Sequence, residues 1–280
     1  MKKEDKIIVT KYQIKGPERP LVKIALVSDL HDRNPDEVLR LLHQQRPDLI
    51  LAAGDLMERH EAALAEWTEE DMDVWQGLGR GSRIFSRAVK LADEIFHPWG
   101  KQIPWEEENA RTFLREASGV APVFLGVGNH EWYFTGEDRR VMRENHVTLL
   151  DNADTFLRLK QGQPVRIGGL STRYDLAWLH DFCEKSGFKI LICHHPEYYD
   201  RFIRNTSLER QLGLVVSGHA HGGQWRIGKR GVMAPGQGLF PKYTHGVFFN
   251  KLVVSAGLAN TANIPRFGNP RELVIISVPV

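Results

Sequence analysis

Val22-Lys-Ile-Ala-Leu-Val-Ser28 is a nearly continuous apolar run of strand length, and Asp29-Leu30-His31 follows it directly. A run in which polar residues do not alternate with apolar ones is typical of a strand covered on both faces. The run therefore predicts an inner strand of an α/β sheet. Asp29 and His31 leave this strand at its carboxyl end, where α/β proteins place their ligands.

Residues 34–37 predict the start of a helix after this strand. Asn34 has the position of its cap, and Glu37 completes a capping box. Apolar residues within 38–42 form the inner face of the helix, and Leu49 to Ala53 form a second apolar strand. A strand, a helix and a strand in this order predict parallel pairing with a right-handed crossover.

Further apolar strands end near Gly128, Cys193 and Ser217, whereas residues 154–170 and 246–256 have the pattern of β-hairpins. Strands joined through helices pair in parallel, and hairpin strands pair antiparallel. The chain is therefore predicted to form a layered α/β sandwich with mixed sheets.

The composition excludes several classes of protein. The chain has 280 residues, of which 42% are hydrophobic, enough for a substantial core. Its 37 basic and 35 acidic side chains leave a net charge of +2, too small for a dedicated nucleic-acid-binding protein. The sequence shows neither an apolar run of membrane-spanning length nor a secretory signal, and Cys183 and Cys193 read as reduced packing residues. We therefore expect a cytoplasmic location, with peripheral membrane contact as the alternative.

Residues 56–118 separate two predicted strands by far more than the usual connection. They carry 13 acidic and 8 basic side chains, a net of −5, so the rest of the chain carries +7. We predict one domain, residues 1–280, in which 56–118 is a helical insertion. The insertion either packs on its own aromatic side chains or forms a lid beside the site. Its tryptophans are Trp67, Trp75, Trp99 and Trp105.

Polar residues gather where the apolar strands end. Because the carboxyl ends of strands in an α/β sheet meet at one crevice, these residues are predicted to lie together. Their imidazole and oxygen ligands, without thiolates, suit Mn, Fe, Zn or Ni better than a structural zinc site. The segments are Asp29-Leu30-His31, Gly54-Asp55, Gly128-Asn129-His130-Glu131, Cys193-His194-His195-Pro196 and Gly218-His219-Ala220-His221-Gly222-Gly223.

In this order the segments resemble the signature of the calcineurin-like metallophosphoesterase superfamily: D-x-H, G-D, G-N-H-[DE], a histidine after an apolar strand, and G-H-x-H. Gly218 to Trp225, G-H-A-H-G-G-Q-W, and Ile264 to Gly268 are similar to a bacterial subgroup with membrane-associated phosphoesterases and lipid-directed pyrophosphatases. The resemblance implies a four-layer α/β/β/α sandwich with two mixed β-sheets. It also implies a metal-dependent phosphoesterase.

The resemblance assigns the metal ligands residue by residue. It implies two divalent metal ions, with Mn or Fe favoured over Zn or Ni. Of the adjacent residues His194 and His195, His194 is the expected metal ligand. Whether His195 contacts metal or substrate stays open. The first metal would be held by Asp29, His31 and His221, the second by Asn129, His194 and His219, and Asp55 would bridge both.

The same resemblance implies a mechanism. Two cations that share a hydroxide can direct it at the phosphorus of a phosphodiester, pyrophosphate or phosphomonoester. His130 is the predicted general acid or charge stabiliser, next to Asn129, which serves as both ligand and catalytic residue. Glu131 either orients His130 or accepts a hydrogen bond from a nearby backbone amide.

Substrate contacts are expected from residues after the last ligands. Arg266 is the predicted side-chain contact, while Gly222 and Gly223 either form a turn or let the backbone approach a phosphate. The expected substrate is a small-molecule or lipid-linked phosphate ester, not a nucleic acid, and the oligomeric state stays open.

Two other functions are alternatives to a phosphoesterase. A catalytically silent metal-binding scaffold of the same fold would bind a protein partner, and a dinuclear metallopeptidase or amidohydrolase would share the metal chemistry but not this order of motifs. The intact His130 and the complete ligand set favour the enzyme over the scaffold, and the order of the motifs excludes the peptidase.

Overall fold

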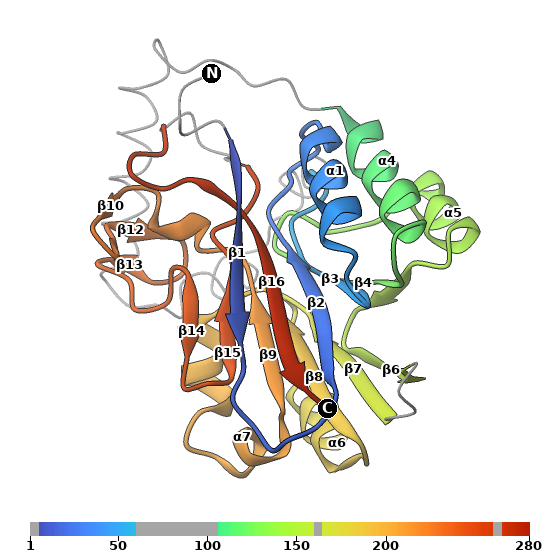
Figure 1. Cartoon of the computed structure of the whole chain (residues 1–280), viewed down its shortest axis with the longest axis vertical. Helices are drawn as coiled ribbons and strands as arrows, with labels where there is room; N and C mark the ends of the chain where they lie inside the picture. Colours follow the sequence, from blue (N-terminus) through green and yellow to red (C-terminus); the bar gives the residue numbers. More distant parts are fainter. Residues whose placement is uncertain (1–5, 60–105, 160–163, 260–264) are drawn as a thin grey trace, which may run out of the picture.

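The computed structural model describes residues 6–59, 106–159, 164–259 and 265–280. Two six-stranded sheets face each other in this structure (Figure 1). The first has the order β1-β16-β2-β3-β4-β5, in which β2 to β5 pair in parallel and β16 runs antiparallel to β2. Its strands are β1 (Ile7–Gln13), β2 (Leu21–Val27), β3 (Leu49–Ala53), β4 (Val123–Gly126), β5 (Thr148–Leu150) and β16 (Arg271–Pro279).

The second sheet has the order β14-β15-β9-β8-β7-β6. Both predicted hairpins are confirmed, since β6 pairs antiparallel with β7 and β14 pairs antiparallel with β15. The inner strands β7, β8, β9 and β15 pair in parallel, so this sheet is also mixed. Its strands are β6 (Ala153–Arg158), β7 (Pro164–Leu170), β8 (Phe188–Cys193), β9 (Leu214–Ser217), β14 (Gly246–Phe248) and β15 (Leu252–Val254).

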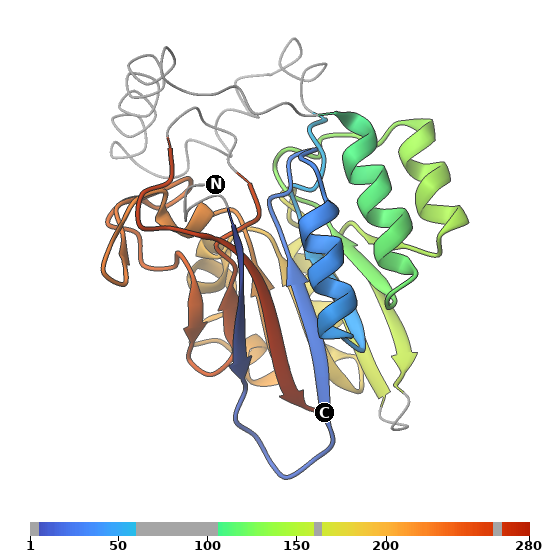
Figure 2. The same cartoon turned by 45° about the horizontal axis from the view of Figure 1, so that its top comes forward.

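Helices cover the outer face of each sheet. The helices α1, α4 and α5 lie side by side on the first sheet in both views (Figures 1 and 2), and α6 and α7 pack on the second. A π-helical turn spans Tyr199–Ile203, and a 3₁₀ turn spans His221–Gly223. The helices are α1 (Asp36–Gln45), α4 (Glu107–Ser118), α5 (Gly136–Glu144), α6 (Leu176–Glu184) and α7 (Ser207–Gln211).

Three separate apolar clusters show that the sandwich has four layers. On β2, Ala25 and Val27 face the helices, whereas Ile24 and Leu26 face the second sheet. A third cluster, which includes Phe182 of α6, lies between the second sheet and its helices. Strand β2 therefore buries both faces, which explains its continuous apolar sequence. The predicted four-layer α/β/β/α sandwich with two mixed sheets is confirmed.

The predicted capping box of α1 is wrong. The helix begins at Asp36 with Pro35 at the cap position and no side-chain cap, although Asn34 Oδ1 accepts a hydrogen bond from the Asp36 amide at 2.8 Å. Glu37 instead accepts from the Ile7 amide of β1 at 3.2 Å. A contact between distant segments has thus replaced the local cap that the sequence pattern suggested.

The end of the predicted insertion belongs to the sandwich. Residues 107–118 form α4, which buries Ala110, Phe113 and Leu114 in the cluster beneath α1. The four tryptophans and the other residues from 60 to 105 lie outside the described residues. Among the described helices, none combines the length and apolar character needed to cross a membrane.

Two small hairpins connect the 3₁₀ turn to β14. They pair β10 (Arg226–Ile227) with β11 (Arg230–Gly231), and β12 (Met233–Ala234) with β13 (Gly238–Leu239). They lie at the margin of the second sheet, away from α1, α4 and α5 (Figure 1).

Candidate metal centre

The loops that follow β2, β3, β4, β8 and β9 converge at one edge of the sandwich. Backbone hydrogen bonds join them: the Asp29 amide donates to the Gly54 carbonyl at 3.1 Å, and the Gly218 amide donates to the His194 carbonyl at 3.1 Å. The His130 amide donates to Asp55 Oδ1 at 2.9 Å. The predicted meeting of strand ends is therefore present in the structure.

Asp29, His31 and His221 form one cluster. Their ligand atoms lie within 4.8 Å of one another, and all three side chains are buried. The Nε2 atom of His221 is 3.7 Å from Asp29 Oδ1, and its Nδ1 is 3.1 Å from the Ala259 carbonyl. The second ring nitrogen of His221 is thus held by the backbone, as is usual for a histidine that ligates metal.

Asp55, His194 and His219 form a second cluster with the same 4.8 Å limit. His194 Nε2 lies 3.1 Å from Asp55 Oδ2 and 3.2 Å from Asn129 Oδ1, so the predicted amide ligand faces the same point. His194 Nδ1 lies 2.6 Å from the Ala53 carbonyl. Asp55 also groups with His31 and His130, so its carboxylate is common to both sides of the site.

Several buried polar atoms of this site suit a cation. Within the described residues, Asp29 Oδ2 and His31 Nε2 are buried without a hydrogen-bond partner. Such groups are rare in folded proteins, because leaving them unsatisfied costs about 1–3 kcal/mol each. Carboxylate, amide and imidazole ligands together fit first-row divalent metals.

Five of the predicted ligands have left-handed backbone conformations, with φ between 44° and 65°. Residues other than glycine seldom adopt this region, and such strain concentrates at functional sites. The strained positions are Asp29, His31, Asp55, His219 and His221.

Burial keeps most of these imidazoles neutral. It lowers the pKa of His31 to about 4 and that of His221 to about 3, and it lowers the pKa of His219 as well. Burial also opposes the charged form of His194, but the adjacent Asp55 carboxylate overcomes it and raises the His194 pKa to about 10. Neutral imidazole is the form that ligates metal. The negative charge of Asp55, which favours a proton on His194, would favour a metal cation at the same place.

Glu58, which the sequence analysis did not single out, joins the two histidines at the centre of the site. Its Oε1 lies 2.6 Å from His31 Nδ1, and its Oε2 lies 2.9 Å from His130 Nδ1. The His130 side chain is 23% exposed, so it can meet a ligand. Burial alone would lower the pKa of His130, but Asp55 and Glu58 raise it to about 9.

The sequence analysis gave Glu131 two possible roles, and the structure shows the one in which it accepts hydrogen bonds from backbone amides. Its carboxylate accepts hydrogen bonds from the backbone amides of Gly128, Asp55, Leu56 and Met57 at 2.7 to 3.3 Å. The residue therefore joins the loop after β3 to the loop after β4. It holds the backbone around Asp55.

The family described as calcineurin-like phosphoesterase matches residues 22–223, most of the chain. The chain belongs to this family. Its members are metal-dependent phosphoesterases, and the clusters around Asp55 lie within the matched residues. The likeness to the narrower bacterial subgroup stays a prediction.

Three proteins are related to this chain in sequence. The uncharacterized metallophosphoesterase YkoQ of Bacillus subtilis is 26% identical over 220 residues, which cover 74% of this chain and 64% of YkoQ. The putative metallophosphoesterase F40B5.2 of Caenorhabditis elegans is 23% identical over 223 residues, covering 72% of this chain and 37% of that protein. The uncharacterized protein YpbG of Bacillus subtilis is 28% identical over 269 residues, covering 93% and 82%. The chain thus spans less than two thirds of YkoQ and of F40B5.2.

In this member of the family, the ring nitrogens of His195 contact residues other than Asp55. Its Nδ1 lies 3.2 Å from Glu197 Oε1, and its Nε2 lies 3.1 Å from Thr172 Oγ1. Its ring packs against that of His219, with 4.2 Å between centroids. His194 is the member of the pair that reaches Asp55, as the sequence analysis expected. His195 forms a further group of possible ligands with Glu197 and His219, and its contact with metal or substrate stays a prediction.

Arg266 and the two glycines lie beside the cluster of Asp29. The guanidinium of Arg266 is buried, donates to the Ala259 carbonyl at 2.6 Å and lies 3.4 Å from His221 Nδ1. Gly222 and Gly223 have φ of 64° and 82°, and a Cβ on Gly223 would lie 2.3 Å from a neighbouring backbone carbon. The turn alone therefore requires both glycines, and contact of these three residues with substrate stays a prediction.

Proposed function

We propose that this phosphoesterase uses two divalent metal ions to hydrolyse a phosphodiester, pyrophosphate or phosphomonoester. The observation that supports the proposal is the shared position of Asp55. Its carboxylate belongs to a cluster with His194 and His219 and to a second cluster with His31 and His130. A single carboxylate between two ligand groups is the arrangement that fixes two cations at the short separation used in phosphate chemistry.

In the proposed centre, Asp29, His31 and His221 hold one metal, Asn129, His194 and His219 hold the other, and Asp55 contacts both. When bound, the metals supply Lewis acidity toward a phosphoryl oxygen and lower the pKa of water. The carboxylate, amide and imidazole ligands, without sulfur, suit Mn, Fe, Zn or Ni, and the family resemblance favours Mn or Fe among these.

His130 is the proposed general acid or charge stabiliser. Glu58 holds its Nδ1, so Nε2 faces the Asp55 side of the site at 3.9 Å from Oδ2. From there the imidazole can donate a proton or hydrogen bond to the oxygen that departs from phosphorus. Its partial exposure leaves room for the substrate.

The proposed substrate is a small or lipid-linked phosphate ester. The support comes from the likeness of Gly218 to Trp225 and of Ile264 to Gly268 to the bacterial subgroup. Arg266 is the proposed contact for a phosphate. We also propose that the chain forms one domain, with the predicted insertion confined to the residues between Arg59 and α4. A cytoplasmic location remains part of the proposal.

The test is a substrate panel with defined metals. Metal-free protein is reconstituted with Mn²⁺, Fe²⁺, Zn²⁺ or Ni²⁺ and assayed on an aryl phosphomonoester, an aryl phosphodiester and a pyrophosphate. We expect turnover of at least one class, strongest with Mn²⁺ or Fe²⁺, and its loss in Asp55→Asn. Full metal binding without turnover of any substrate would instead favour the protein-binding scaffold.

A further inference from the structure

The four most exposed large apolar side chains of the described chain lie on neighbouring segments. Ile227 is 73% exposed, Phe240 73%, Phe267 70% and Leu239 60%, whereas no other large apolar residue of the described ranges exceeds 48%. We call residues 226–240 together with Phe267 the hairpin surface. Bulky apolar side chains gathered in this way usually mark an interaction site.

Backbone hydrogen bonds make these segments continuous. The Arg226 amide donates to the Phe267 carbonyl at 2.8 Å, and the Val232 amide donates to the Trp225 carbonyl at 2.8 Å. The Phe240 amide donates in turn to the Val232 carbonyl at 2.8 Å. These hydrogen bonds therefore join the two separate hairpins, β10–β11 and β12–β13, to each other and to Phe267.

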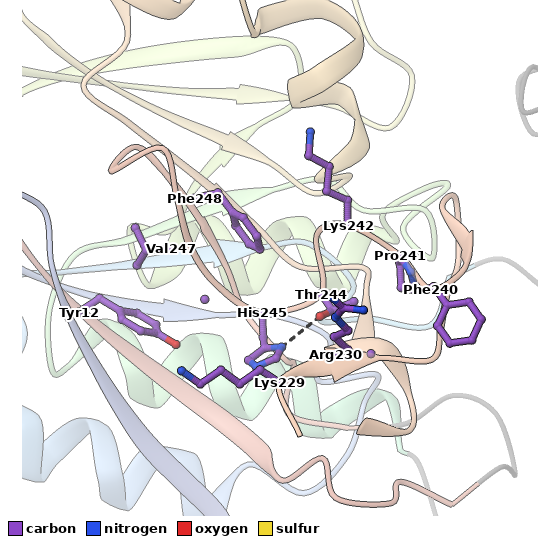
Figure 3. Close-up of a pocket in the computed structure, with 12 residues that line it drawn as sticks. Tyr12, Lys229, Arg230, Phe240, Pro241, Lys242, Thr244, His245, Val247 and Phe248 are labelled. Atoms are coloured by element: carbon purple, nitrogen blue, oxygen red, sulfur yellow. Dashed lines mark hydrogen bonds between the residues drawn. The ribbon is translucent and has the colours of Figure 1, made fainter. Parts of the chain in front are cut away.

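Cations accompany the apolar side chains. Lys229 is exposed in the turn after β10, and Arg230 is exposed at the start of β11; neither forms an ion pair with any residue that the structure describes. They line a cavity of about 630 Å³ with Tyr12, Thr244 and His245 (Figure 3). Figure 3 shows Lys229 extended toward Tyr12, with Phe240 at the opposite end of the row of lining residues. The cavity therefore combines cationic and apolar lining residues and can accept an anionic group.

The stretch of sequence that forms this surface carries no acidic residue, although the carboxylates of Glu197 and Glu272 approach it near Gly236 and Arg226. Residues 210–271 contain neither Asp nor Glu, although 35 acidic residues occur in the chain. Lys242, at the cavity margin, is engaged by Asp200 at 2.6 Å, which leaves Lys229 and Arg230 as its available cations. The hairpin surface therefore complements an anionic partner.

We propose that the hairpin surface docks on a membrane that contains anionic lipid. Apolar side chains enter the boundary between headgroups and acyl chains, and Lys229 and Arg230 bind headgroup phosphates, one of them within the cavity. A protein interface is the weaker fit, because its centre is depleted of lysine, whereas Lys229 and Arg230 lie between Ile227 and Leu239 in the sequence of this surface. Lysine and arginine at a bilayer surface keep their charges among the headgroups.

Docking in this manner brings the metal centre close to the bilayer. The Val232 amide donates to the Gly223 carbonyl at 3.1 Å, and Gly223 lies two residues after the predicted ligand His221. The hairpin surface is therefore built directly on the turn that carries this ligand. Docking does not depend on catalysis, so it is tested separately from the proposed function.

The experiment is cosedimentation of the full chain with vesicles of phosphatidylcholine alone or mixed with phosphatidylglycerol. The variants are Lys229→Glu/Arg230→Glu and Leu239→Ala/Phe240→Ala. Matched controls are Arg40→Glu/Arg143→Glu, which reverses two exposed charges on α1 and α5, and Phe156→Ala on β6. Circular dichroism verifies that each variant is folded.

We expect binding to the anionic vesicles that weakens with salt. The charge reversal should weaken it by at least about tenfold, since each basic residue near an anionic surface contributes about fivefold. The apolar variant should also weaken it by about tenfold, and the controls should bind like the wild type. Absent vesicle binding, equal binding to neutral vesicles, or hairpin variants that bind like the wild type would overturn the proposal. Loss of self-association in the hairpin variants without vesicle binding would overturn it in favour of contact between copies of the chain.

Discussion

Glu58 Oε2 lies 2.9 Å from His130 Nδ1, and the other oxygen of the same carboxylate lies 2.6 Å from His31 Nδ1. One side chain thus orients both the proposed acid and a proposed metal ligand. A carboxylate on one ring nitrogen fixes the tautomer and leaves the other nitrogen directed into the site. Glu58 is therefore a positioning residue for two parts of the proposed reaction.

Replacing Glu58 by Gln should lower kcat by about 10- to 100-fold, because the amide cannot hold both imidazoles in the required tautomers. KM should change less than kcat, since Glu58 acts through His130. Metal content is measured alongside the kinetics, to separate weakened metal binding from misplacement of His130.

Glu116→Gln provides the matched control, because Glu116 is an exposed residue of α4. It should leave kcat, KM and metal content unchanged. Wild-type kinetics in Glu58→Gln at full metal content would contradict the positioning role.

Replacing His130 by Ala should lower turnover by about 10²- to 10⁴-fold, the usual contribution of a general acid. Metal content should stay near that of the wild type, because His130 is not a proposed ligand. The loss should be smaller for a substrate whose leaving group needs no proton. Equal activity of the variant and the wild type on a poor leaving group would exclude the assigned role.

The sequence predicted the clusters at strand ends because their cause is simple. Apolar runs mark inner strands, and parallel strands bring their carboxyl ends to one edge. Asp29, Asp55 and His194 directly follow such runs, so their convergence needed only the topology. Which of His194 and His195 faces Asp55 came from the family resemblance, and the geometry agrees.

Glu58 was missed because it lies beyond the strand end, where neither periodicity nor turn chemistry marks it. The available signal was a second carboxylate three residues after Asp55 in the same loop. The capping box of α1 failed for a different reason, since Glu37 is held by Ile7 and Arg271 from distant strands. Both errors concern contacts between segments far apart in the sequence, which local patterns do not contain.

Asp55→Asn should reduce the metal content more than the replacement of a residue that belongs to only one of the two clusters. Because Asp55 is common to both clusters, its loss weakens both proposed metal sites. His221→Ala and His194→Ala should each lower the content by about one ion per chain, as inductively coupled plasma mass spectrometry can measure.

Asp151→Asn, at an exposed carboxylate, is the control and should bind metal like the wild type. If Asp55→Asn retained both ions, or if either histidine variant lost both, the shared-carboxylate arrangement would be wrong.

Asp138→Asn should destabilise the protein in a way that depends on pH. The Asp138 carboxylate is buried against Arg59, with Oδ2 at 3.0 Å from Nε and Oδ1 at 3.1 Å from Nη2. Asp138→Asn leaves Arg59 with Asp32 as its remaining buried carboxylate partner, at 2.7 Å, and removes the hydrogen bonds to a charged Asp138. We therefore expect a loss of about 3 kcal/mol in the free energy of unfolding at neutral pH.

The pH dependence follows from the pKa of Asp138. Burial would raise this pKa, but hydrogen bonds from Arg59 and Thr135 lower it to about 2, below its value of about 3.9 in an unfolded chain. The unfolded state therefore binds the proton first, and the stabilisation is present above about pH 4 and lost as the pH falls through about 2. The difference in Tm between the wild type and Asp138→Asn should narrow over that interval, as calorimetry can measure. Asp181→Asn, at a side chain that is 68% exposed, should show almost no difference at any pH. If the difference in Tm between the wild type and Asp138→Asn did not change with pH, the effect of the substitution would come from packing and not from the charge of the Asp138–Arg59 pair.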